Sequence, residues 1–298
     1  MKWGGRWAGA NDAVSKLYAA LRFSALMSKS GNVPSGRHQF EDPAHAMTLP
    51  FRLRAASIHL LASALIAALA AALVFLVWYP SPYSTLAGGT SLFLLIVSVD
   101  VVMGPALTAV AASPGKRRAE LMRDLAVIVV LQLAAFGYGL YTMAMARPVA
   151  LAFEIDRFRV VTAADIESAS LAEAPPALQT LPWTGPRQIA AIKPTDPSEQ
   201  MKALELGLAG FDLSMQPKYW REYAPLADAA WRAARPVPVL LAKYPQLAGE
   251  VARMAKEVDQ PAQALRFLPL MSRRESWVTL LAEPGARVVG HLPVDGFF

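Results

Sequence analysis

Residues 86–112 read LAGGTSLFLLIVSVDVVMGPALTAVAA, an apolar run in which Asp100 is the one charged side chain. A helix of roughly 20 apolar residues crosses the hydrocarbon core of a bilayer, which is about 30 Å thick. Two further runs of this kind lie on either side of it, at 58–79 and 125–146. Soluble cores rarely need three such segments in succession, so the sequence predicts a three-helix transmembrane bundle within residues 51–147.

The composition divides the chain into two parts. Hydrophobic residues make up 54% of it, above the usual range for globular proteins, and the three apolar runs account for the excess. Residues 148–298 hold 16 basic and 17 acidic side chains, so the net charge of +6 comes from residues 1–147. Because this positive charge borders apolar runs, it indicates a membrane protein rather than one that binds nucleic acid. The chain has no cysteine, which excludes disulfides and thiolate metal sites.

Basic residues at the ends of the runs predict how the helices cross the membrane. Arg52 and Arg54 precede the first run, and further basic residues lie at 116–123, between the second and the third. The link between the first and second runs, residues 80–89, has no charged residue. Since basic loops stay on the cytoplasmic side, we expect a cytoplasmic N-terminus, spans in a bacterial inner membrane, and residues 148–298 in the periplasm.

Residues 1–50 differ from the rest of the chain. They contain Gly, Ser, Pro and scattered charges, and they are too polar for a signal peptide. We expect either a poorly ordered cytoplasmic leader or an upstream extension, in which case translation would begin at Met47, just before the first span.

Periodicity in residues 148–298 predicts an α+β soluble domain with a small sheet. Apolar residues alternate from 151 to 160 with a phase shift near Asp156-Arg157, which predicts a half-buried strand with a bulge. Asp196, followed by proline and then by Glu199, predicts a helix start. The other expected elements are a strand at 188–192, helices at 218–234 and 245–257, and a terminal hairpin of 277–281 and 287–292. The first strand of the domain, which begins at residue 151, and the terminal hairpin are expected in one sheet.

Ten short motifs lie along the spans and beyond them. They are Ile58-His59-Leu60-Leu61, Phe75-Leu76-Val77-Trp78-Tyr79-Pro80, Gly88-Gly89-Thr90, Val99-Asp100-Val101-Val102-Met103-Gly104-Pro105, Asp124-Leu125-Ala126-Val127, Tyr138-Gly139-Leu140-Tyr141, Ala146-Arg147-Pro148, Asp156-Arg157-Phe158, Gly210-Phe211-Asp212 and Leu268-Pro269-Leu270. With them, the chain resembles the type IV pilin accessory proteins of the TfpX/TfpZ kind over roughly residues 50–298.

This resemblance implies a helper of type IV pilus (fimbrial) biogenesis. Such proteins act with a particular major pilin and influence its assembly in a chaperone-like way, without being the pilin, the motor or the peptidase. The implied partners are that pilin, through its transmembrane helix and its head domain, the lipid bilayer, and other pilus assembly proteins. The resemblance implies no catalytic residue and no cofactor.

Asp100 is the centre of the first candidate site. A carboxylate near the middle of a span costs about 2.5–3.5 kcal/mol on insertion scales, so it should face protein or water rather than lipid. Gly104 and Thr108 follow at spacings of four on the same helix face, and glycine permits close approach of another helix. Pro105 cannot donate a backbone hydrogen bond, so we expect a kink that exposes a carbonyl beside the carboxylate.

Three hypotheses compete for this face. Asp100 could be an internal tie to Gln132 on the third span or to His59. It could instead receive the apolar N-terminal helix of a pilin, whose amino terminus and near-terminal glutamate also need polar partners in lipid. Ion or proton transport is the third hypothesis, and one carboxylate is its only support. Gln132 shares a helix face with small or apolar side chains, which we interpret as helix packing; these are Ile128, Ala135 and Gly139.

Four aromatic residues form the second candidate site: Tyr219, Trp220, Tyr223 and Trp231. On a helix, three of them lie near one face, at spacings of three and eight. Such a face packs against a sheet in most proteins, but left exposed it would dock the head domain of a pilin. Burial of the rings distinguishes the two interpretations.

The sequence shows no pattern typical of catalysis, cofactor binding or metal binding. Gly88-Gly89-Thr90 lacks the rest of a phosphate loop, no Gly-x-Ser-x-Gly elbow occurs, and the four histidines are too far apart for a metal motif. Glu154 and Asp156 share a strand face beside Arg157 and Arg159, which we interpret as a solvated, charge-balanced face. We therefore expect a protein that is not an enzyme. The alternative to a pilus assembly factor is a membrane-anchored sensor with a periplasmic ligand-binding domain.

Overall fold

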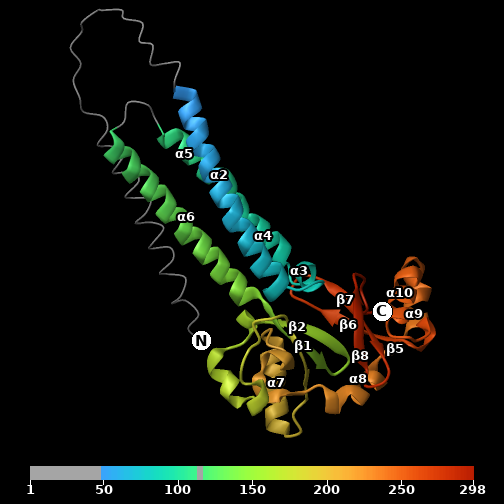
Figure 1. The fold of residues 1–298 in the computed structure, drawn as a ribbon. Coiled ribbons are helices and arrows are strands. Elements are labelled where there is room, and N and C mark those ends of the chain that lie inside the picture. The colour runs from blue at the N-terminus through green and yellow to red at the C-terminus, as the bar shows by residue number, and fades with distance from the viewer. Residues whose placement is uncertain (1–47, 113–116) are drawn as a thin grey trace, which may run out of the picture. The chain divides into compact units, whose positions relative to one another are not determined.

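The computed structural model describes residues 48–112 and 117–298 (Figure 1). Three of its helical segments are long and apolar enough to cross a membrane, which confirms three candidate spans. The expected leader and the alternative start at Met47 lie outside the described residues, as does Lys116 of the basic loop. The spans run over Leu53–Trp78, Gly89–Ala111 and Arg118–Ala146.

Each span either contains a π-helical segment or extends beyond the apolar run that predicted it. The first consists of α2 (Thr48–Ala72) and a π-helical segment, η2 (Leu73–Trp78). The second consists of α4 (Gly89–Ser98), the π-helical η3 (Val99–Met103) and α5 (Gly104–Ala111), and the third is α6 (Arg118–Ala146). The outer helices begin before the predicted runs because a helix continues into polar residues that remain in water or headgroups. Helix α2 packs against α5, and α6 packs against both α4 and α5, so the second span lies between the other two.

The link between the first two spans is a tight turn that depends on glycine. The short helix α3 (Tyr83–Leu86) is followed by Gly88, whose φ of 72° is left-handed. At Gly89 a Cβ atom would lie 2.6 Å from the ring of Tyr79, so only glycine allows this approach. The hydroxyl of Tyr79 in turn donates to the carbonyl of Met143 on α6, at 2.9 Å. Side chains of this turn therefore hold the first and third spans at one end.

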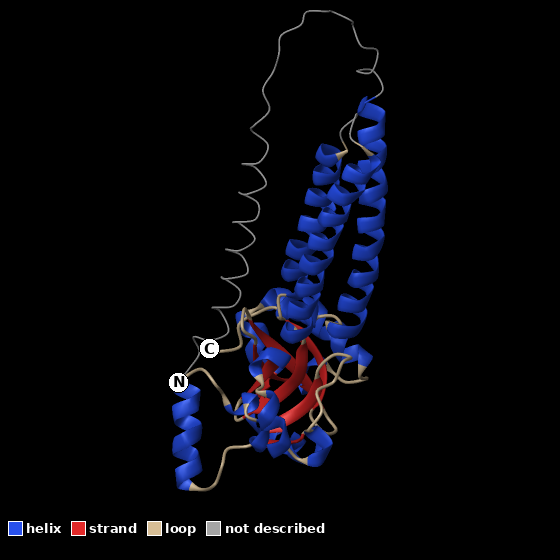
Figure 2. Cartoon of the chain, turned by 90° about the vertical axis from the view of Figure 1, so that its left-hand side faces the viewer, coloured by secondary structure: helices blue, strands red, loops and turns tan. Residues whose placement is uncertain are grey.

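Residues 148–298 form the predicted α+β domain, but the sheet has eight strands and is larger than the small sheet expected (Figure 2). Its order is β4-β3-β1-β2-β6-β7-β8, with β5 beside β6. The first and last strands of the domain lie in this one sheet, as predicted. The strands are β1 (Pro148–Glu154), β2 (Arg157–Thr162), β3 (Arg187–Ala191), β4 (Trp220–Glu222), β5 (Arg235–Pro236), β6 (Arg266–Met271), β7 (Ser276–Ala282) and β8 (Arg287–Leu292).

The predicted bulge near Asp156 is wrong: the chain turns back there, and β1 and β2 form a hairpin. Ile155 lies in the turn between Glu154 and Arg157 and adopts a left-handed φ of 56°. β-Branched residues rarely adopt this conformation, so the sequence did not indicate a turn here. The predicted solvated face is wrong for Glu154, which is 8% exposed and accepts a hydrogen bond from the Ser214 backbone N–H at 3.1 Å. Both faces of β1 are covered, so the strand is buried along its whole length.

The helices of the domain agree with the sequence in two places and differ in a third. Asp196 caps α7 (Pro197–Leu208) by accepting from the backbone N–H groups of Ser198 and Glu199, at 2.9 and 3.0 Å. Helix α10 (Ala248–Glu257) fits the predicted segment 245–257. The helix predicted at 218–234 exists only as α8 (Ala227–Ala233), because the preceding residues pair with β3 as strand β4. A short helix that was not predicted is α9 (Val237–Lys243).

Hydrogen bonds and ring contacts connect the spans to the sheet domain. The hydroxyl of Ser272 donates to the carbonyl of Leu86 at 2.8 Å, and the N–H of Gly185 donates to the carbonyl of Val77 at 3.0 Å. The Arg147 guanidinium, directly after α6, lies 4.2 Å from the centroid of the Trp183 ring. These contacts hold the domain against the ends of the spans at points well separated in the sequence.

A buried histidine belongs to the same junction. Nε2 of His291 on β8 is 3.3 Å from the hydroxyl of Tyr83, and Nδ1 is 3.0 Å from the hydroxyl of Thr279. Burial lowers the pKa of His291 to about 4, so the ring is neutral near pH 7. The junction therefore places no charged imidazole between α3 and the sheet.

We expect the attachment of α7 to the rest of the domain to weaken at acidic pH. The Glu199 carboxylate accepts from Lys218 at 2.7 Å, Lys202 at 2.9 Å and Tyr219 at 3.1 Å, and these bonds lower its pKa from 4.5 to about 2. A pKa lowered by folding gives stabilisation that is present above pH 4.5 and is lost as the pH falls towards 2. Amide exchange of α7, corrected for intrinsic rates, should therefore accelerate over this range. In Glu199→Gln the exchange should be fast throughout; equal, pH-independent protection in both proteins would contradict the expectation.

Candidate functional site

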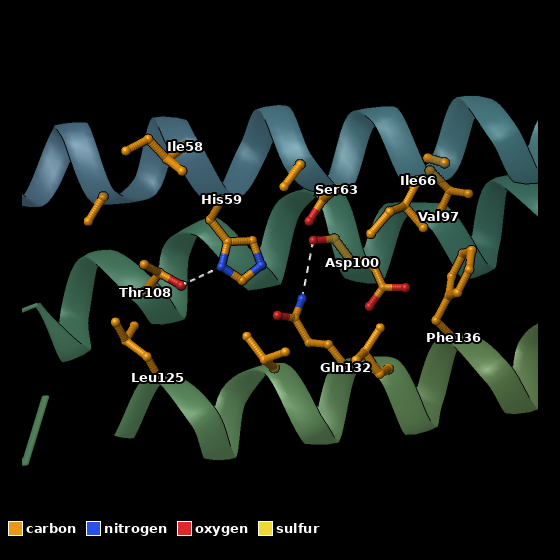
Figure 3. A pocket seen from close by; sticks show the side chains of 15 residues that line it. Ile58, His59, Ser63, Ile66, Val97, Asp100, Thr108, Leu125, Gln132 and Phe136 are labelled. Atoms are coloured by element: carbon orange, nitrogen blue, oxygen red, sulfur yellow. Dashed lines mark hydrogen bonds between the residues drawn. The ribbon is translucent and has the colours of Figure 1, made fainter. Parts of the chain in front are cut away.

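A cavity of about 410 Å³ lies between α2 and α6, with the second span as its floor (Figure 3). Its walls are apolar, and its polar side chains lie on or near the floor. Helix α2 supplies Ala55, Ile58, His59, Ala62, Ser63, Ile66 and Ala67; the second span supplies Val97, Asp100 and Thr108; α6 supplies Leu125, Val129, Gln132, Leu133 and Phe136. We call this cavity the intramembrane groove.

The backbone around Asp100 is π-helical and is followed by Pro105. In a π-helix the N–H of residue i bonds to the carbonyl of residue i−5, and Pro105 has no N–H to offer the carbonyl of Asp100. That carbonyl instead accepts from Nε2 of Gln132 on α6, at 3.4 Å. The predicted exposed carbonyl is therefore present, in a π-helical turn, and it connects the second and third spans. Pro105 itself does not line the groove.

The predicted face with Gly104 and Thr108 meets His59 of α2. The hydroxyl of Thr108 is 2.7 Å from Nδ1 of His59. A Cβ on Gly104 would lie 2.2 Å from Nε2 of Gln132 and 2.8 Å from Nε2 of His59, so glycine leaves the space that both side chains occupy. The three spans thus bring their polar residues to one place. The sequence did not indicate that His59 would pair with Thr108, because a histidine near a span end is ordinary.

Gln132 is hydrogen-bonded to Asp100, but this bond leaves two side-chain acceptors unused. The bond runs to the backbone of Asp100 and is long. Among the described residues, Oδ1 of Asp100 and Oε1 of Gln132 are buried and have no hydrogen-bond partner. Since buried acceptors are nearly always paired in proteins, these two oxygens mark the groove as a site that can receive a hydrogen-bond donor.

The four aromatic residues of the second candidate site lie in the domain core. Tyr219, Trp220 and Tyr223 are each 9% exposed or less and belong to three separate buried clusters, and Trp231 is half-buried against the cluster that contains Tyr223. Their polar atoms are paired internally: the Trp220 indole N–H donates to the carbonyl of Ser214, and the Tyr223 hydroxyl donates to the carbonyl of Ala286, each at 2.8 Å. Burial of these rings supports the packing interpretation, so they offer no exposed aromatic patch for docking.

A group of exposed apolar residues of the domain lies elsewhere, on and after α7. Met201, Leu204 and Leu208 share one side of this helix and are 57%, 57% and 83% exposed, and Phe211 follows them. No residue of α7 is buried. This side of α7, unlike the predicted aromatic cluster, is an apolar surface that the described part of the domain leaves exposed.

Within residues 48–112 and 117–298, no group of three or more His, Asp or Glu side chains could hold a metal ion. The groove has one carboxylate and one imidazole, and the imidazole is engaged with Thr108.

Comparison with known proteins identifies relatives over most of the chain. The family model for "Fimbrial assembly protein FimB" matches residues 48–88. Fimbrial assembly proteins of Dichelobacter nodosus are similar over longer stretches. The serogroup I protein is 34% identical over 83% of this chain and 96% of its own length, and the serogroup E1 protein is 32% identical over the same shares. The protein of serogroups C1 and C2 is 45% identical over 39% of this chain and 88% of its own length. No solved structure matches the chain significantly.

Proposed function

The chain belongs to the family of fimbrial assembly proteins of type IV pilus biogenesis, and from that membership we propose that it binds a specific major pilin in the membrane and modulates its stability or assembly. One observation supports this function more than any other. The groove between α2 and α6 has apolar walls and a polar floor, and an apolar helix is the kind of ligand that such a site in a bilayer can take.

The proposal includes an arrangement in the membrane. The three spans form a bundle in the bacterial inner membrane, the N-terminus is cytoplasmic, and residues 148–298 lie in the periplasm. The charges support it: Arg117, Arg118 and Arg123 flank the start of α6, whereas the turn between the first two spans has none. Trp78 and Trp183, with ring centroids 6.5 Å apart, lie at the end of the spans where aromatic residues favour the membrane interface.

In this arrangement the protein contacts a pilin in two compartments. The spans hold its membrane helix, and the exposed apolar face of α7 is available to its head domain. In this proposal the protein acts by binding and not as an enzyme.

The function is tested by deletion and by co-purification. In the deletion strain we expect surface pili to be lost or strongly reduced while pilin is still made and processed. The full-length protein, extracted in mild detergent, should carry the major pilin of the same strain with it. Normal piliation in the deletion strain, together with no pilin in the purified sample, would contradict the proposal.

A further inference from the structure

Two buried oxygen atoms of the intramembrane groove lack a hydrogen-bond donor among the described residues. They are Oδ1 of Asp100 on the second span and Oε1 of Gln132 on the third. Both side chains line the groove, Asp100 from its floor and Gln132 from α6 (Figure 3). An acceptor without a donor costs more free energy in lipid than near water, because lipid offers no replacement. Two such acceptors at one site indicate that the donor comes from another molecule.

The other polar groups of the groove do not fill this need. Nε2 of Gln132 donates to the Asp100 backbone, and Nδ1 of His59 is paired with Thr108. Neither the Ser63 hydroxyl nor Nε2 of His59, which also belong to the lining, makes a hydrogen bond to either oxygen. No lysine or arginine lines the groove, so its described lining offers the Asp100 carboxylate no ammonium or guanidinium. Neither acceptor is served from within the groove.

The chemistry of the missing donor follows from the acceptors. A hydroxyl carries one hydrogen and a carboxylate carries none, whereas a protonated primary amine has three hydrogens and a positive charge. Of these three groups, only the amine can serve two acceptors and also neutralise a carboxylate. The walls on either side, with Ile58, Ile66, Val129 and Leu133, require that the rest of the ligand be apolar.

We propose that the pilin helix bound in this groove carries a protonated amino group at the depth of Asp100, and that this group donates to Asp100 Oδ1 and Gln132 Oε1. The inference rests on the proposed function and specifies the group that the groove recognises. The pairing removes two unsatisfied acceptors and a lone charge from lipid, so the bound state is favoured over the empty groove.

The test uses the full-length protein co-expressed with its major pilin and purified in detergent. Asp100→Asn keeps the shape of the side chain but removes the charge and one acceptor, so recovered pilin should fall ten-fold or more. Without pilin, the same variant should melt at the same or a higher temperature than the unaltered protein, because an unpaired buried charge is gone. Asp100→Glu keeps the carboxylate and its charge and should retain pilin.

Each other outcome has a definite meaning. Full pilin recovery with Asp100→Asn, or lost recovery with Asp100→Glu at normal expression, overturns the inference while co-purification with the unaltered protein still supports the proposed function. A lower melting temperature of Asp100→Asn without pilin would show that the carboxylate is an internal tie, which also overturns it. Absence of pilin from the unaltered protein contradicts the proposed function itself.

Discussion

Ala62→Trp is expected to reduce the pilin that co-purifies with the protein by about ten-fold or more. Ala62 lines the groove from α2, so an indole there occupies the space proposed for the pilin helix. Forcing a large side chain into a filled contact costs about 1–3 kcal/mol, and about 1.4 kcal/mol corresponds to a ten-fold change in affinity. Surface pili should decrease in parallel, because in this proposal pilus assembly depends on binding of the pilin helix in the groove.

The matched control is Ala64→Trp. Ala64 lies two residues further along α2, is exposed, and does not line the groove. This variant carries the same indole in the same helix, so it should retain pilin and piliation. Equal loss in both variants would show that bulk on α2 is harmful by itself and would count against binding in the groove.

Phe158→Ala is expected to have the largest effect on the stability of the sheet domain. The Phe158 ring is fully buried, with Phe153 and Tyr223 at centroid distances of 5.8 and 5.9 Å. Truncating a buried phenylalanine lowers the free energy of unfolding by about 3–5 kcal/mol, out of about 5–15 kcal/mol for a typical domain. The urea midpoint of the full-length protein, followed by tryptophan fluorescence, should therefore fall sharply.

A surface truncation provides the comparison for Phe158. Leu208→Ala removes an apolar side chain that is 83% exposed, so it should leave the midpoint nearly unchanged. A shift for Phe158→Ala no larger than that for Leu208→Ala would mean that the ring does not hold the two hairpin strands against the rest of the core.

The membrane part could be predicted from the sequence to a large extent. Apolar length alone located the spans, and the spacing of Asp100, Gly104 and Thr108 placed them on one face. Pairing between spans was harder to foresee, because it depends on the depth and rotation of each helix. Gln132 was anticipated as a partner of Asp100, but its contact with the backbone carbonyl arises from the π-helical turn before Pro105.

The domain was harder to predict because long-range pairing decided its local structure. Trp220, Tyr223 and Trp231 have the spacing of an aromatic helix face, yet residues 220–222 pair with β3 as a strand. Strand β6 was missed because Pro269 in its middle argues against a strand. Ile155 occupies a left-handed turn position that its side chain disfavours, so its hairpin looked like a bulge. In each case tertiary packing overrode the local preference.

Cysteine crosslinking to the pilin helix tests the central claim most directly. The chain has no native cysteine, so single cysteines can be placed on the groove walls at Ser63 and Leu133, and on outward faces at Leu65 and Leu131. Paired with a cysteine scan of the pilin helix, both groove positions should crosslink to it and both outward positions should not. Crosslinks from the outward positions alone, or none from either wall while pilin still co-purifies, would contradict binding of the pilin helix between α2 and α6.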